Sequence, residues 1–261
     1  MQTFLKTIIN RLLNLKKNIF FIIVLFSSTF LMGTTPSILK MVDEVYYQAN
    51  SIEEFLKSEA LILNFLSSYP DQTDLIWRLA RNQFRLAKRA FRDKQKTNLF
   101  KQCLKTAKKG VSIDEKSAEN IYYMGLCLGN ISIQKGILSS LNHRNTLKVS
   151  MKKVIAINPN VENAGPHRFL GVYYSVLPFF LGGDSEKAVS NLETAVKLAP
   201  DFAENYFYLG KVYFGSGFYS KAKHALEQFL KLANSVKNDP EMPKQIDEAR
   251  DILNEIKTSA N

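Results

Sequence analysis

The stretch that decides the fold is AGPHRFLGVYYSVLPFFLGGDSEKAVSNLETAVKLAPDFAENYFYLGKVYFGSGFYSKAKHALEQFLKL, residues 164–232. It contains two similar units that follow one another directly. Each unit has a Leu-Gly pair, a tyrosine three residues after the glycine, and then an alanine followed four residues later by a leucine. These positions are Leu170, Gly171, Tyr174, Ala188 and Leu192 in the first unit, and Leu209, Gly210, Tyr213, Ala222 and Leu226 in the second.

This order of large and small residues resembles the tetratricopeptide repeat, a helix–turn–helix unit. The small residues allow two helix axes to approach closely, and the large ones fill the space between the helices. We therefore expect an all-α fold, a tetratricopeptide-like solenoid of helical hairpins. The composition agrees, because 46% of the residues are hydrophobic and no run of alternating apolar and polar residues indicates a sheet.

Earlier parts of the chain repeat the large–small pattern at wider intervals. The large residues Leu79, Met124, Leu170 and Leu209 stand 45, 46 and 39 residues apart. A plain tetratricopeptide repeat has about 34 residues, so the hairpins are predicted to be lengthened. We assign residues 35–257 to the repeat domain and expect a C-terminal capping helix after residues 239–240.

Local signals place individual helix starts. Ser51 and Glu54 form a predicted capping box for a helix over residues 51–68. The Gly-Gly-Asp sequence at 182–184 resembles a phosphate loop, but it is short and its Asp184 would repel a phosphate. Asp184 is better interpreted as the N-cap of a helix over residues 185–198.

The N-terminal segment, residues 1–33, combines basic residues with the apolar run 19–32, IFFIIVLFSSTFLM. This order is typical of a secretory signal peptide, and the alternatives are an uncleaved N-terminal anchor and a buried helix. Either of the first two places the protein in the periplasm or cell envelope, with any membrane attachment made through this segment.

The formal net charge is +11, and much of it lies in residues 78–109, where twelve Lys or Arg accompany the single acid Asp93. Three interpretations are open: a solvated face, a surface for an acidic protein or anionic lipid, and a nucleic-acid site. The third is disfavoured because core residues share these helices and a secretory signal precedes them, so we expect no nucleic-acid partner.

No enzyme signature is present, so we expect neither catalysis nor a cofactor. The histidines are scattered, and the two cysteines, Cys103 and Cys127, stand in no metal-binding pattern, which also argues against a metal site. The two cysteines are expected on neighbouring helices, where either a disulfide or two buried thiols can form.

The repeat register predicts which side chains face the inner wall of the solenoid. Most are aromatic or aliphatic, with isolated cations among them, a lining that suits an apolar or amphipathic ligand with an anionic end or a matching partner segment. The alternative is that they only pack between helices. The predicted residues are Trp77, Arg81, Phe84, Tyr122, Leu126, Asn130, Arg168, Val172, Phe207, Lys211 and Phe214.

Residues 115–215 also resemble the T-component family of TRAP transporters, through AENIYYMGLCLGN, MKKVIAINPN and the LGGD step. The resemblance implies an exported adaptor that binds a TRAP-type solute-binding protein and assembles as a trimer. Family members are often lipoproteins, whereas this chain lacks the lipid-carrying cysteine. The alternative function is a general tetratricopeptide scaffold of the cell envelope without a link to transport.

One insertion, Ser175–Gly183, lengthens a hairpin and contains Pro178, Phe179 and Phe180. Proline is expected to end the preceding helix. The two phenylalanines are predicted to be buried, either under their own hairpin or against a neighbouring subunit.

Overall fold

The computed structural model describes residues 35–236 and 239–259, which form eleven α-helices and no strand. The all-α expectation is confirmed. The chain divides into two compact units, residues 1–48 and 49–261, and the signal or anchor predicted for residues 1–33 lies outside the described residues. In the first unit the described helix is α2, Thr35–Gln48.

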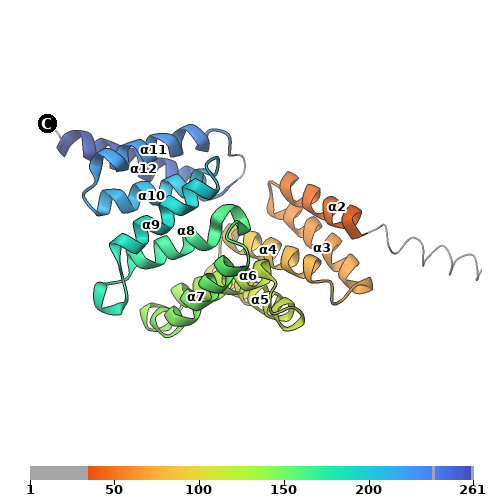
Figure 1. Ribbon diagram of the computed structural model, residues 1–261. Coiled ribbons are helices and arrows are strands. Elements are labelled where there is room, and N and C mark those ends of the chain that lie inside the picture. Colours follow the sequence, from red (N-terminus) through yellow and green to blue (C-terminus); the bar gives the residue numbers. More distant parts are fainter. Residues whose placement is uncertain (1–34, 237–238, 260–261) are drawn as a thin grey trace, which may run out of the picture. The chain divides into compact units, whose positions relative to one another are not determined.

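The second unit is a stack of helical hairpins (Figure 1). Its helices pack as the pairs α4–α5, α6–α7, α8–α9 and α10–α11, with α3 against α4 and α12 against α11. The bounds are α3 Ile52–Ser68, α4 Thr73–Arg89, α5 Asp93–Ile113, α6 Ala118–Gln134, α7 Ile137–Ile157, α8 Val161–Val176, the 3₁₀ turn η1 Phe179–Leu181, α9 Ser185–Leu198, α10 Ala203–Gly215, α11 Tyr219–Ala233 and α12 Met242–Ser259.

The predicted helix starts are confirmed at atomic detail. The Ser51 hydroxyl accepts a hydrogen bond from the Glu54 backbone N–H at 3.2 Å, and the Glu54 carboxylate accepts one from the Ser51 backbone N–H at 3.0 Å. Asp184 accepts a hydrogen bond from the Lys187 backbone N–H at 2.9 Å, as expected of an N-cap. Each cap satisfies backbone groups that the first turn of a helix leaves without partners.

The small–large pattern works as the sequence predicts. A Cβ atom added to Gly171 would lie 2.4 Å from Leu192 Cγ, and one added to Gly210 would lie 2.6 Å from Leu226 Cγ. Both leucines are fully buried. Glycine is therefore required where the two helices of a hairpin touch, and this contact fixes the spacing within each pair.

The lengthened hairpins arise chiefly from their second helices. Both α5 and α7 have 21 residues, whereas α9 has 14 and α11 has 15. The final helix covers the end of the stack, because Met242 and Ala249 of α12 are buried in the same cluster as Leu226 and Phe229 of α11. The capping role expected for this helix is thus confirmed.

Candidate functional site

The eleven residues predicted for the inner wall lie on α4, α6, α8 and α10, which are the first helices of four successive hairpins. Consecutive helices of this set contact one another, so the predicted residues are spread along one continuous run of packed helices. Most of their side chains are engaged by groups of the protein itself. Their binding of a ligand or partner stays a prediction.

Arg168 is the centre of a polar cluster between α8 and α10. Its guanidinium donates to Asn205 Oδ1 at 2.8 Å and lies 3.6 Å from the Glu204 carboxylate. It also lies 4.7 Å from the centre of the Phe202 ring. The side chain is only 11% exposed, so this cation is engaged within the protein.

The same cluster holds an unusual backbone segment at the start of α8. Glu162, Asn163 and Ala164 all have left-handed φ angles, of 47°, 57° and 60°. Residues other than glycine rarely adopt left-handed backbone angles, because this conformation costs each of them about 1–2 kcal/mol. Arg168 donates to the Asn163 carbonyl at 3.1 Å, and the Asn205 amide donates to the same carbonyl at 3.3 Å. These two side chains thereby stabilise the turn.

Two tyrosines adjoin this cluster. Tyr122 is 3% exposed, and its hydroxyl is within 2.3 Å of the position that a Cβ on Gly165 would take. Burial raises the pKa of Tyr122 to about 12. Burial and the nearby Glu204 carboxylate also raise the pKa of Tyr208 far above its usual value. Both phenols are therefore neutral at physiological pH.

On α4 the predicted Trp77 and Arg81 contact each other. The Arg81 guanidinium lies 4.9 Å from the centre of the indole ring, and the arginine is 2% exposed. The indole N–H donates to Asp74 at 3.2 Å. This pair is therefore an internal cation–π contact rather than an open cationic position.

The remaining predicted residues pack inside hairpins or form local bonds. The ring of Phe84 lies 5.7 Å from that of Phe100, and the ring of Phe207 lies 5.1 Å from that of Phe229. Asn130 donates to a carbonyl one turn earlier in α6 at 2.9 Å. The three others, Leu126, Val172 and Phe214, are partly buried.

Ion pairs that the sequence pattern did not reveal connect inner helices to the C-terminal part of the unit. Arg85 of α4 pairs with Asp239 at 3.0 Å, although 154 residues separate them, and Lys88 pairs with Glu241. Lys211 of α10 pairs with Glu248 of α12 at 2.5 Å. Two cations of the basic stretch 78–109 therefore serve internal contacts and not a solvated face.

The prediction that Phe179 and Phe180 are buried under their own hairpin is wrong. They are 91% and 83% exposed, on the 3₁₀ turn between α8 and α9. Pro178 ends the preceding helix as expected, and the turn then projects beyond the hairpin (Figure 1). The hydrophobic character of these side chains indicated burial, but their place at the tip of a connection leaves no neighbouring helix to cover them.

The outer face of α5 carries an open row of cations. Lys94, Lys101, Lys105 and Lys108 recur at intervals of seven, four and three residues, which places them on one side of the helix, and all four are exposed. Within the part of the chain that the structure describes, none of them lies within 4.0 Å of a carboxylate, whereas Lys109 pairs with Asp71 at 3.6 Å.

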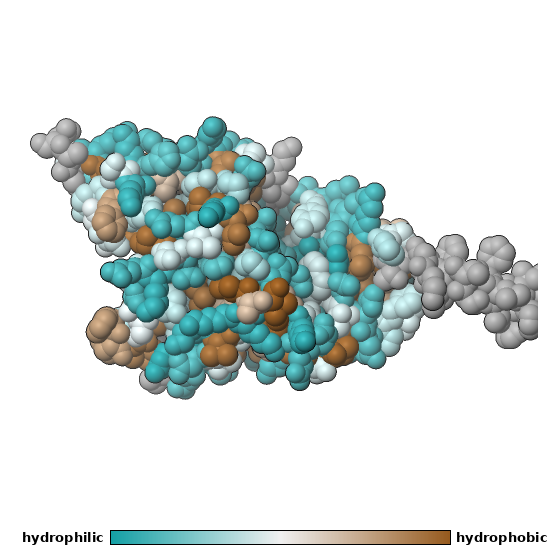
Figure 2. Space-filling view, viewed as in Figure 1, coloured by the Kyte–Doolittle hydropathy of each residue, from teal (hydrophilic) through white to brown (hydrophobic). Residues whose placement is uncertain are grey.

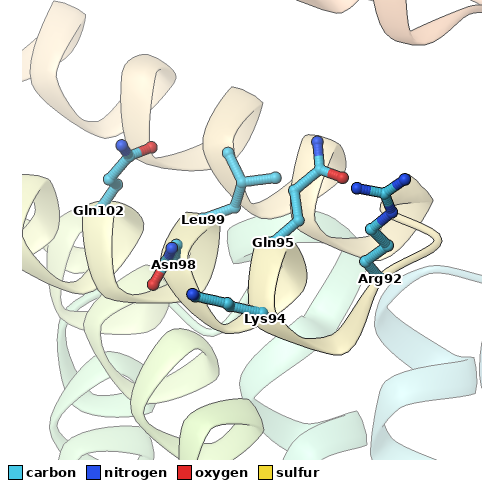
Figure 3. Close-up of a pocket in the computed structure, with 6 residues that line it drawn as sticks. All are labelled: Arg92, Lys94, Gln95, Asn98, Leu99 and Gln102. Atoms are coloured by element: carbon cyan, nitrogen blue, oxygen red, sulfur yellow. The ribbon is translucent and has the colours of Figure 1, made fainter.

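A shallow groove of about 540 Å³ runs beside this row, and Figure 3 shows its lining. Its residues project from α5 and from the turn that precedes the helix, and they combine cations, amides and one leucine. They are Arg92, Lys94, Gln95, Asn98, Leu99 and Gln102. The exposed lining is largely apolar, so only the cations Arg92 and Lys94 offer an anionic partner a charged contact here.

Cys103 of α5 and Cys127 of α6 form a disulfide with Cα atoms 6.1 Å apart. Both residues are fully buried, so the bond joins the first two lengthened hairpins internally. His167 is hydrogen-bonded to Asn191 at 3.2 Å, and burial lowers its pKa. The described residues contain no group of three His, Cys, Asp or Glu side chains placed to hold a metal ion.

The fold defines a class: the described chain is a tetratricopeptide-like helical-repeat protein. A thermophilic tetratricopeptide-repeat protein of Thermus thermophilus has the same fold, with a TM-score of 0.62 at 18% identity over 82% of this chain and 97% of its own. The type IV pilus biogenesis factor PilW matches with a TM-score of 0.55 at 14% identity, over 87% of this chain and 92% of its own. At such identities the likeness concerns the fold alone.

The chain belongs to the family described as Regulator of microtubule dynamics protein 1-3, whose model matches residues 38–175 and 183–257. Regulator of microtubule dynamics protein 1 of Bos taurus is 26% identical over 191 residues, 66% of this chain and 59% of that protein. The Pongo abelii protein of the same name is 25% identical over the same length, 66% of this chain and 60% of its own. The chain thus spans about three fifths of the length of these relatives.

These comparisons correct the resemblance drawn to the TRAP T-component family, for which they give no support. The residues quoted for that resemblance are small–large helix contacts and an N-cap, features that helical-repeat proteins share. The comparisons therefore support the repeat fold and assign the chain to a different family. Among the described residues, no helix has the length and apolarity needed to span a membrane.

Proposed function

We propose that this chain is an interaction scaffold that binds an acidic protein surface through the outer face of α5, and that the microtubule is this surface. The observation that carries the proposal is the row Lys94, Lys101, Lys105 and Lys108. These four exposed cations have no ion-pair partner in the described part of the chain, and a shallow groove lies beside them.

Exposed charges without internal ion pairs can bind another protein without first breaking a contact within the chain. Such charges accelerate encounter with an oppositely charged surface and fix its orientation. The inner wall offers less, because Arg168 and Lys211 already have carboxylate partners and Arg81 is buried against Trp77. A ligand with an anionic end would have to displace these contacts first.

The choice of the microtubule as the partner comes from the name of the relatives. Proteins called regulators of microtubule dynamics act on a polymer whose outer surface is acidic, which complements a row of lysines. Since this chain spans about three fifths of their length, the assignment of that partner to the chain is our proposal. A TRAP solute-binding partner, export, a trimer and an apolar ligand are supported by no comparison, and we do not include them.

Co-sedimentation with microtubules tests the proposal directly. The variant K101E/K105E/K108E is expected to weaken binding about tenfold or more, because it places three repulsive charges on the contact. The matched control K152E/K153E/K197E makes the same change in net charge at three exposed lysines of α7 and α9.

Two further conditions sharpen the result. Binding should weaken as salt rises, and it should weaken on microtubules whose acidic C-terminal tails have been removed by limited proteolysis. Equal loss in the two triple variants would mean that only net charge matters, and the α5 site would be wrong. No sedimentation of the wild-type chain at low salt would reject the partner.

A further inference from the structure

The helical hairpins place four of their connections on one edge of the second unit. The first helices α4, α6, α8 and α10 contact one another in order. Because short connections join consecutive helices that pack together, the chain reverses at each connection, and we infer that these four helices run in the same direction. Their C-terminal ends, which carry the turns within each hairpin, therefore lie along one edge, and the turns between hairpins lie along the other. In Figure 1 the α8–α9 and α10–α11 turns are seen at the same side.

Each of these four turns exposes a large apolar side chain. Phe91 of the α4–α5 turn is 94% exposed and Ile133 at the end of α6 is 71% exposed. Phe179 and Phe180 follow on the α8–α9 turn, and Phe218 of the α10–α11 turn is half exposed. Figure 2 shows hydrophobic surface at the free ends of the α8–α9 and α10–α11 hairpins. We call these five side chains the apolar tips.

Cations accompany the apolar tips. Arg92 follows Phe91, Lys135 follows Ile133 by two residues, and Lys221 lies 5.6 Å from the centre of the Phe218 ring. The opposite edge also carries an exposed lysine, Lys116, but it differs in its carboxylates and in its apolar residues. Its turns carry exposed carboxylates, and its exposed large apolar residues reach only 38–41% exposure. The carboxylates are Asp71, Asp114, Glu115 and Asp201, and the apolar residues are Ile113, Ile157 and Leu198.

The α8–α9 turn has a defined backbone that holds its two phenylalanines outward. The Pro178 carbonyl accepts from the N–H groups of Leu181 at 2.9 Å and Gly183 at 3.0 Å, and Asp184 N–H donates to the Tyr174 carbonyl at 3.0 Å. At Gly183 an added Cβ would lie 1.7 Å from the Leu177 carbonyl oxygen, so only glycine fits. The exposure of this turn is thus built into the fold.

We propose that this edge docks on a lipid bilayer that contains anionic lipid, with the apolar tips inserted among the lipids and the neighbouring cations at the headgroups. The tips stand on separate turns or, for Ile133, at a helix end, which suits a soft apolar phase better than a protein that would need a fitted pocket for each. Binding at a membrane surface combines two contributions: apolar side chains buried among the lipids, and basic side chains attracted to anionic headgroups.

A local probe tests the docking on the full chain, because the apolar run 19–32 can itself hold the chain on vesicles. An environment-sensitive dye is attached through F180C on the proposed edge or, as the matched control, through K116C on the exposed α5–α6 turn of the opposite edge. The native cysteines are buried in their disulfide and do not compete for the dye.

With vesicles of phosphatidylcholine and phosphatidylserine, the dye at position 180 should shift its emission to the blue and be quenched by nitroxide lipids, whereas the dye at 116 should do neither. Phosphatidylcholine alone should give a weaker response at 180. The dye can instead be attached through F218C. In that protein, adding F179S/F180S should lower the apparent affinity for anionic vesicles about tenfold or more.

Two results would overturn the proposal. The first is an equal response, or none, at positions 180 and 116 with the anionic vesicles. The second is a dye response that vesicles do not change but that grows with protein concentration and disappears in F179S/F180S. That result would mean that the edge joins copies of the chain and does not dock on a membrane. Unchanged thermal unfolding of F179S/F180S is the check that the substitutions leave the fold intact.

Discussion

The side chain of Asn205 is expected to be one of the most stabilising polar groups of the repeat unit. It is fully buried in α10. Its amide donates to the carbonyls of Ala195 at 3.0 Å, Ala199 at 3.3 Å and Asn163 at 3.3 Å, and its oxygen accepts from Arg168 at 2.8 Å. One amide therefore joins the end of α9, the start of α8 and the Arg168 cluster.

Asn205→Ala removes this amide and leaves buried carbonyls without a donor. The amide has two N–H groups and one accepting oxygen, so about three hydrogen bonds are lost at a net value of about 1 kcal/mol each. The expected loss in the free energy of unfolding is thus about 3 kcal/mol, which corresponds to a fall in Tm of about 6–12 °C in a domain of this size.

Urea unfolding followed by circular dichroism measures the loss, with Asn130→Ala as the matched control. Asn130 donates within its own helix, and its replacement should cost less than about 0.5 kcal/mol. A double-mutant cycle with Arg168→Met should show a coupling of at least about 0.5 kcal/mol, since the two side chains share a hydrogen bond. A loss at Asn205 that does not exceed the control would refute the reasoning.

Three further predictions concern the core. Gly210→Ala should lower the free energy of unfolding by about 1–2 kcal/mol in urea titrations, because its Cβ would lie 2.6 Å from Leu226 and this clash exceeds the helix propensity gained; unchanged stability would contradict it. Since burial holds the pKa of Tyr122 at about 12, the folded state keeps that proton more tightly than the unfolded chain, and stability should fall by about 2–3 kcal/mol between pH ~10 and ~12. Tyr122→Phe should make that part of the pH profile less steep, while Tyr208 and Tyr213, whose pKa values are also raised, still contribute to it. Reduction of the Cys103–Cys127 bond, which spans 24 residues, should cost about 3 kcal/mol, and C103S/C127S should not respond to the reductant.

The repeat architecture could be predicted from sequence because its determinants are local. A glycine in the first helix of a hairpin and a leucine in the second, 16 to 21 residues further on, meet whenever the chain turns back once. Gly171 with Leu192 and Gly210 with Leu226 confirm this spacing. Helix caps such as Ser51–Glu54 are predictable for the same reason, since both partners lie within one turn.

The inner wall could not be predicted in the same way, because its polar contacts join distant residues. No local pattern indicates that Arg85 pairs with Asp239 across 154 positions, or that Asn205 supports a left-handed turn 42 residues earlier. The sequence of that turn, Glu-Asn-Ala, has no glycine to signal a left-handed backbone. Register assigns the predicted inner-wall residues to the first helices of the hairpins, but the partners of their charges lie on helices far away in the sequence.

These distant contacts bear on where a partner can bind. Access to the inner wall would require the separation of Arg168 from Glu204 and of Arg85 from Asp239, pairs in which every side chain is at most about one-third exposed. Breaking a largely buried ion pair leaves a charge without compensation and costs several kcal/mol. The exposed lysines of α5 and the apolar tips need no such rearrangement. This difference in cost is why we propose the outer face of α5 and the edge with the apolar tips, and not the inner wall, as the surfaces that meet partners.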